Sequence, residues 1–177
     1  IITGQTALAT APADTDEFII SDAGVLKRID ASLVIPSVAN TPAFLAYVNS
    51  TQSIANNTAV IITNYGAEVF DTHNAFASST FTVPSGGAGK YFFVGSVSTS
   101  VSSANTANQF NLQIKTGSTS LGSVTILRPP YAKLQCSGMA DLSVGDTVTM
   151  QIYQDSGSAV TIDGDRKVFF TGFKLIT

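Results

Sequence analysis

The segment at residues 108–115 has the sequence NQFNLQIK, in which apolar and amide side chains alternate strictly. Phe110, Leu112 and Ile114 therefore share one face of an extended chain, and the amides share the other. This alternation is typical of an antiparallel strand with one face on a core and one face in water. The same alternation recurs at residues 147–154, so the segment is one member of a larger β-structure.

Short strands of this kind fill the chain from residue 41 to residue 177, separated by clusters of Asn, Gly, Ser, Asp and Pro. No segment shows a sustained helical period. The predicted strands are 43–49, 58–63, 67–70, 79–83, 90–101, 109–115, 121–127, 132–140, 147–154, 159–162 and 167–176. This pattern predicts an all-β fold, an antiparallel jelly-roll sandwich of about ten strands.

Two strands depart from simple alternation, because both of their faces are apolar. They contain YFFV at residues 91–94 and VFFTGF at residues 168–173. A strand of a two-sheet sandwich has only one face on the core, so the large apolar residues of its other face need another partner. Contiguous aromatic surface left in water promotes aggregation, so this pattern predicts association between copies of the chain.

The composition of the 177-residue chain narrows the function. Only 12% of its residues are charged and the formal net charge is −3, which argues against nucleic-acid binding, since that depends on clustered Lys and Arg. No apolar run approaches the ~20 residues that span a bilayer, so no membrane insertion is expected. Because the first residue is Ile1 rather than Met, we expect a processed product, a trimmed chain or the ordered part of a longer one.

Candidate chemical residues are few, and each has a structural interpretation that we favour. Cys136, the only cysteine, is in phase with Leu134 and is expected to be buried. His73, the only histidine, lies in a polar turn. The Asp-rich turns at 155–158 and 163–165 fit tight-turn chemistry better than a structural calcium site. We therefore predict no catalytic residue, no metal site and no cofactor, and we do not expect an enzyme.

The first 40 residues differ from the rest and form a predicted attachment arm. Strands are predicted at 17–20 and 25–29, joined by the turn signal of residues 21–24 into a short β-hairpin, with a helical turn at 30–34. A lone hairpin is marginal in water and needs a neighbour. The apolar residues predicted to attach this arm to a particle are Phe18, Ile19, Ile20, Leu26 and Ile29.

Residues 41–177 carry a recognisable set of motifs. They are Phe70, Phe76 and Phe81, then Gly89-Lys90-Tyr91-Phe92-Phe93, then Phe170-Thr171-Gly172-Phe173-Lys174-Leu175, with Pro42 to Tyr47 at the start and Asp141 to Val148 before a long strand. This set resembles the globular head of complement component 1q, in the tumour-necrosis-factor-like jelly-roll superfamily. The resemblance implies a homotrimer. It also implies that a group of aromatic residues is divided between the core and the threefold axis: Tyr91, Phe93, Phe169, Phe170 and Phe173. No Gly-x-y repeat precedes the head, unlike the family pattern.

Residues 6–33 resemble short modules that are common in bacteriophage structural proteins. Joined to a trimerising head, they suggest a virion protein whose arm, residues 1–40, binds a major capsid or fibre protein and whose head faces outward as a capsid decoration or fibre tip. A receptor-binding head that takes a host surface glycan or receptor, and a secreted lectin-like or signalling module, are the alternatives. The predicted contact loops are 50–58, 102–108, 116–120, 128–131 and 155–159. We expect a charged residue at Phe93 or Phe173 to give unfolded or insoluble protein.

Overall fold

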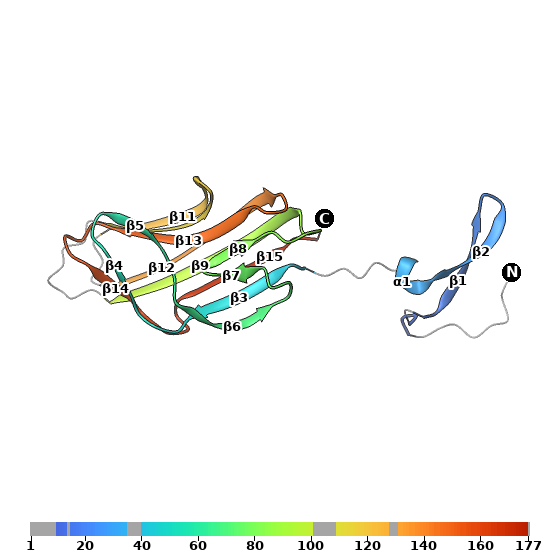
Figure 1. Ribbon diagram of the computed structural model, residues 1–177, viewed down its shortest axis with the longest axis horizontal. Coiled ribbons are helices and arrows are strands. Elements are labelled where there is room, and N and C mark those ends of the chain that lie inside the picture. The colour runs from blue at the N-terminus through green and yellow to red at the C-terminus, as the bar shows by residue number, and fades with distance from the viewer. Residues whose placement is uncertain (1–9, 14, 35–39, 101–108, 128–130, 177) are drawn as a thin grey trace. The chain divides into compact units, whose positions relative to one another are not determined.

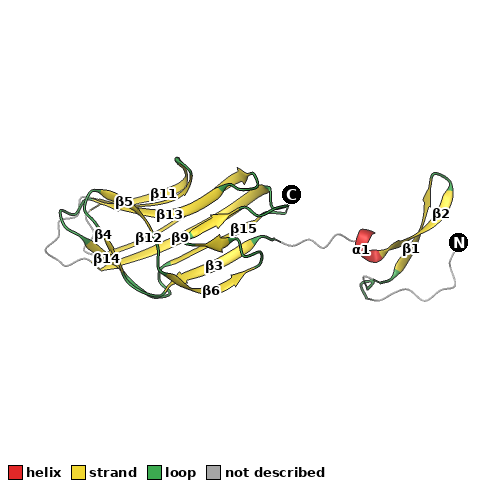
Figure 2. Cartoon of the chain, viewed as in Figure 1, coloured by secondary structure: helices red, strands yellow, loops and turns green. Residues whose placement is uncertain are grey.

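The computed structural model describes residues 10–13, 15–34, 40–100, 109–127 and 131–176. The chain divides into two compact units, Ile1–Ala39 and Asn40–Thr177. We call the second unit the head. Within the described residues, strands make up almost all of the regular structure (Figures 1 and 2). No helix among these residues has both the length and the apolar character needed to cross a membrane.

The first unit contains the predicted β-hairpin. Strands β1 (Glu17–Asp22) and β2 (Val25–Asp30) pair antiparallel, and α1 (Ala31–Val34) follows. The two-residue turn between the strands is Ala23-Gly24, and both residues have positive φ, 50° and 82°. Such a turn matches the right-handed twist of a hairpin, which explains why the strands extend to the turn itself. The predicted hairpin and helical turn are both confirmed.

The head is a sandwich of two antiparallel sheets (Figure 1). The six-stranded sheet contains β5 (Thr58–Ile61), β7 (Phe76–Ala77), β8 (Thr80–Thr82), β10 (Gln109–Thr116), β11 (Thr119–Leu127) and β13 (Thr147–Gln154). The seven-stranded sheet contains β3 (Ala43–Val48), β4 (Gln52–Ile54), β6 (Tyr65–Asp71), β9 (Gly89–Ser100), β12 (Tyr131–Leu142), β14 (Val160–Ile162) and β15 (Phe169–Lys174). The predicted jelly-roll class is confirmed, although short strands raise the number above ten.

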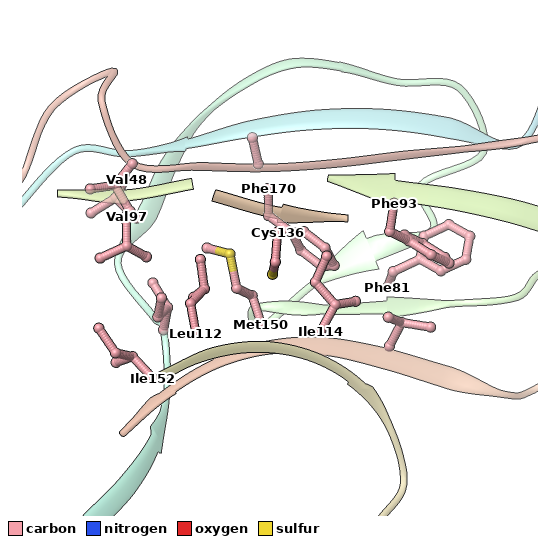
Figure 3. Close-up of a cluster of buried hydrophobic side chains, with 14 of the residues drawn as sticks. Val48, Phe81, Phe93, Val97, Leu112, Ile114, Cys136, Met150, Ile152 and Phe170 are labelled. Atoms are coloured by element: carbon pink, nitrogen blue, oxygen red, sulfur yellow. The ribbon is translucent and has the colours of Figure 1, made fainter. Parts of the chain in front are cut away.

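The core lies between the inner faces of the two sheets (Figure 3). On β10, the alternating residues Phe110, Leu112 and Ile114 are fully buried. They belong to one buried cluster with side chains of the other sheet such as Phe93 and Phe170. Figure 3 shows Leu112 and Ile114 in this cluster. Alternation in the sequence therefore identified the buried face of this strand correctly.

Three details differ from the sequence-based prediction. Strand β4 lies inside the predicted contact loop 50–58, and the two-residue strand β7 was not predicted. Strand β15 begins at Phe169 rather than at residue 167, because Asp165 forms a turn just before it. The Asp165 carboxylate accepts a hydrogen bond from the Lys167 backbone N–H at 2.7 Å. The backbone carbonyl oxygen of Asp165 accepts a second one from the Val168 backbone N–H.

Two glycines allow the sheets to approach each other at one side of the sandwich. Strands β11 and β12 belong to different sheets, and their backbones meet at Gly122 and Gly138. A Cβ atom at Gly122 would overlap the carbonyl oxygen of Ser137, and one at Gly138 would lie 2.6 Å from the carbonyl oxygen of Leu121. Any side chain at either position would push the two strands apart.

The first and last strands of the head are neighbours. Strand β15 pairs antiparallel with β3, so that Phe173 lies opposite Ala43. The Lys174 backbone N–H donates a hydrogen bond to the carbonyl oxygen of Pro42 at 3.0 Å. The chain therefore enters and leaves the head at the same end of the seven-stranded sheet.

Candidate functional site

The structure divides the five predicted aromatic residues between two faces of one sheet. Tyr91, Phe93 and Phe170 point into the core and are fully buried. Phe169 and Phe173 point away from the core and are half-buried. The register explains the division, because neighbouring residues of a strand lie on opposite faces.

The core aromatic residues form one packed cluster. The Phe93 ring centroid lies 5.5 Å from that of Phe81 and 6.0 Å from that of Phe170. Tyr91 is held in place by its hydroxyl, which donates a hydrogen bond to the carbonyl oxygen of Gly87 at 2.6 Å. Centroid separations of about 4.5–7 Å are those of favourable aromatic pairs. These residues stabilise the fold.

The outward-facing residues of the seven-stranded sheet form a largely apolar surface around Thr171, which we call the apolar face. Its members are Leu45, Tyr47, Phe70, Phe92, Val94, Met139, Phe169 and Phe173. Cross-strand pairing places Met139 opposite Phe92, and Phe92 opposite Phe173. The Phe92 and Phe173 rings meet edge to face with centroids 5.8 Å apart. Phe70 and Met139 expose 44% and 66% of their surface, so a single copy of the head presents much apolar area to water.

Charged residues flank the apolar face at both ends. At one end, the ammonium group of Lys90 lies 3.4 Å from the Asp141 carboxylate. At the other end, the Arg166 guanidinium carbon lies 5.4 Å from the centre of the Tyr47 ring, which favours a cation–π contact. An apolar centre with charged residues at the rim is the usual arrangement of a protein–protein interface.

The position of Phe173 changes one expectation from the sequence. We predicted that a charged residue at Phe93 or at Phe173 would give unfolded or insoluble protein. Phe93 lies in the core, and that expectation stands. Phe173 lies on the half-exposed apolar face, where a charged side chain can reach water, so we now expect the head to fold with charge at this position.

The residues predicted to attach the first unit lie on both faces of the hairpin. Phe18 pairs with Ile29 on one face, whereas Ile19 and Leu26 point to the other. Ile19 and Leu26 expose 77% and 76% of their surface. A salt bridge between Glu17 and Arg28, 2.8 Å long, borders the more exposed face. The apolar surface expected from the sequence is therefore present, but it is not confined to one side.

The predicted contact loops have mixed outcomes. Loops 102–108 and most of 128–131 lie outside the described residues. Ser156, in loop 155–159, is buried, and its hydroxyl donates a hydrogen bond to the Gln154 side chain. The expectation that the whole of this loop is available for contacts is therefore wrong at Ser156, because a buried polar group bonds inside the protein.

The remaining chemical candidates have structural surroundings. His73 lies in a turn where its Nδ1 atom is 2.9 Å from the Thr72 hydroxyl oxygen. Burial raises the pKa of the Cys136 thiol to about 11, so the thiol is protonated near neutral pH and is a poor nucleophile. Across the described residues, no three His, Cys, Asp or Glu side chains gather in a group that could hold a metal ion.

The two sheets and their strand order form a jelly roll with the fold of complement 1q and tumour-necrosis-factor-like domains. Several solved structures share this fold. The globular domain of zebrafish complement 1qA protein is 23% identical, with a TM-score of 0.51, over 76% of this chain and 98% of that one. Murine APRIL at pH 8.0 is 14% identical, with a TM-score of 0.56, over 75% of this chain and 98% of that one. The structure of murine APRIL at pH 5.0 is 13% identical, with a TM-score of 0.54, and also covers 75% of this chain and 98% of that one. No protein-family model and no curated protein sequence matches the chain.

Proposed function

We propose that the chain is a non-enzymatic binding and structural module whose head assembles as a homotrimer through the apolar face. The observation that carries this proposal is the continuous row from Met139 through Phe92 to Phe173 on the outer side of the seven-stranded sheet. Monomeric proteins rarely expose contiguous apolar patches of this kind. Where a large apolar patch is exposed, it usually marks a site of interaction. The trimer is the assembly implied by the resemblance to complement component 1q.

We further propose that this module belongs to the outside of a bacteriophage particle, as a capsid decoration protein or a fibre tip. Two features support this. The first unit resembles phage structural modules, and its exposed Ile19 and Leu26 provide an apolar surface for a capsid or fibre protein. The head carries few charges, as suits a module that binds by shape.

Phe173→Glu is expected to convert the trimer into folded monomers. Each copy would place a charge on the apolar face. A charge that is buried between subunits without an opposite charge beside it destabilises the assembly by about 3–5 kcal/mol. Sedimentation velocity of the full chain measures the result at micromolar concentration. Ile61→Glu is the matched control, because Ile61 is an exposed aliphatic residue on the other sheet, with 39% of its surface exposed.

Two results would contradict the trimer proposal. One is a wild-type chain that sediments as a monomer at micromolar concentration. The other is a Phe173→Glu variant that keeps the wild-type sedimentation coefficient. Circular dichroism of both variants shows whether the head remains folded, so loss of assembly is not confused with loss of structure.

The particle assignment is tested with the double variant Ile19→Glu/Leu26→Glu. We expect wild-type chain to bind phage particles that lack it, to appear as surface knobs in electron micrographs, and to co-sediment with the particles. The double variant should remain folded and trimeric but stay in the supernatant, because two charges replace the exposed apolar pair. Equal co-sedimentation of both chains would contradict attachment through this hairpin.

The alternatives predict different results. A host-receptor head would lie at the phage tail, and the free chain would compete with infection. A secreted lectin-like or signalling module would bind its glycan or receptor through the head alone and would have no affinity for particles.

A further inference from the structure

A hollow of about 290 Å³ lies on the outer face of the six-stranded sheet, over β5, β10 and β13. Its polar lining residues are Gln109, Asn111, Gln113, Gln151 and Tyr153. The strand register brings them together, because Asn111 lies opposite Tyr153, and Gln113 lies opposite Gln151. On β5 the residue opposite Tyr153 is Ala59, whose small side chain leaves room beside the phenol ring.

None of the residues that line this hollow carries a formal charge. Four of the five polar lining residues are amides, each of which can donate and accept hydrogen bonds, and the fifth is a phenol with an aromatic ring. A ligand with several hydroxyl groups needs both donors and acceptors, and its C–H surfaces pack well on an aromatic ring. A phosphate or carboxylate would instead need a cation, and an ammonium group would need a carboxylate.

Two of the amides are available for a ligand. Within the described residues, the Gln109 and Gln113 side chains make no hydrogen bond to another group. Both are half-buried, so neither is simply extended into water. Asn111 is oriented by its Nδ2 atom, which donates to the Thr125 hydroxyl at 2.6 Å. The side-chain carbonyl oxygen of Asn111 accepts no hydrogen bond from the described residues, so it can accept one from a ligand.

The phenol is also held in position. The Tyr153 hydroxyl donates a hydrogen bond to the side-chain carbonyl oxygen of Asn57 at 3.2 Å. The start of β10 is fixed where the Gln109 backbone N–H donates to the Asp155 carboxylate at 2.7 Å. Polar groups placed on paired strands lose little conformational entropy when a ligand binds.

We propose that this hollow is a binding site for a neutral saccharide, with Gln109, Asn111, Gln113 and Gln151 bonding to its hydroxyl groups and Tyr153 packing against its ring. The volume lies near the lower end of the range for small-ligand pockets, about 300–1,000 Å³, which suits a terminal sugar ring rather than a long chain. The site lies within one copy of the head, on the sheet opposite the apolar face, so it does not depend on the trimer.

Saturation-transfer NMR with millimolar sugars tests the proposal. The probes are methyl glucoside, methyl mannoside, lactose and N-acetylglucosamine, with N-acetylneuraminic acid as the acidic comparison. We expect the full chain to bind at least one neutral sugar and to bind the acidic sugar more weakly. The double variant Gln109→Met/Gln113→Met keeps the side-chain length and removes both free amides. It should weaken binding about tenfold or more, since each lost hydrogen bond corresponds to about fivefold in affinity.

The control is Thr82→Ala, an exposed polar truncation on β8 of the same sheet, outside the hollow. It should bind as the wild type does. The Gln109→Met/Gln113→Met variant should keep its unfolding temperature, because these amides have no hydrogen-bond partner among the described residues. The monomeric Phe173→Glu variant should still bind, which separates this proposal from the trimer. Lack of binding to every neutral probe, preference for the acidic sugar, or unchanged affinity in the double variant would overturn the proposal.

Discussion

Phe93→Asp is expected to leave the chain unfolded or insoluble. Phe93 is fully buried and packs between Phe81 and Phe170. Removing a buried phenylalanine ring costs about 3–5 kcal/mol. Burying a carboxylate without a partner costs several kcal/mol more, or requires it to take up a proton. Together these losses approach the whole stability of a typical domain, about 5–15 kcal/mol.

Phe92→Asp is the matched control, because Phe92 is the preceding residue on the same strand and points to the other face. It should give soluble protein with the circular dichroism spectrum of a β-sheet, and it should lose the trimer. The same substitution at neighbouring residues therefore distinguishes the role of the core face of β9 in folding from the role of its outer face in assembly. A soluble, cooperatively unfolding Phe93→Asp variant would show that this ring is not essential to the core.

Gly122→Val is expected to lower the free energy of unfolding by about 3 kcal/mol, at the upper end of the usual cost of overpacking. A Cβ atom at Gly122 would overlap the carbonyl oxygen of Ser137. Backbone atoms cannot rotate away as a flexible side chain can, so β11 would have to separate from β12. For a protein of this size the unfolding temperature should fall by about 10 °C, as thermal unfolding followed by circular dichroism would measure.

Ser123→Val is the control for Gly122→Val. Ser123 is the next residue on β11 and is exposed, so the same side chain there should change the free energy of unfolding by about 0.5 kcal/mol or less. If the two variants unfold at the same temperature, the close approach of β11 and β12 does not limit the fold.

The sequence was sufficient to predict most of the fold. Strong alternation at Phe110, Leu112 and Ile114 identified both a strand and its buried face. Short strands were harder to predict from the sequence. Strand β4, for example, has the sequence Gln52-Ser53-Ile54, which contains one apolar residue and is too short to show a period. Strand β4 forms because it pairs with β14, and that pairing joins residues about 100 positions apart, such as Ile54 and Val160. Such long-range partners leave no local signal.

The candidate site was only partly predictable. The aromatic pattern of residues 91–94 showed that both faces of the strand are apolar, but alternation alone does not say which face meets the second sheet. The register settles it, with Phe93 inside and Phe92 outside. The hollow over β5, β10 and β13 was missed for another reason. Its amides come from two strands, and each strand alone shows an ordinary solvent face.

The pairing of β3 with β15 bears on how the head can be engineered. Since Ala43 and Phe173 are cross-strand partners, a short peptide can link the two ends of the isolated head without disturbing the sheet. New ends can then be opened at Gly117, a turn glycine with positive φ and open space around it. Proteins tolerate such circular permutation best at exposed turns of this kind. A cargo fused to the permuted head would emerge beside β10 and β11 instead of next to the entry strand.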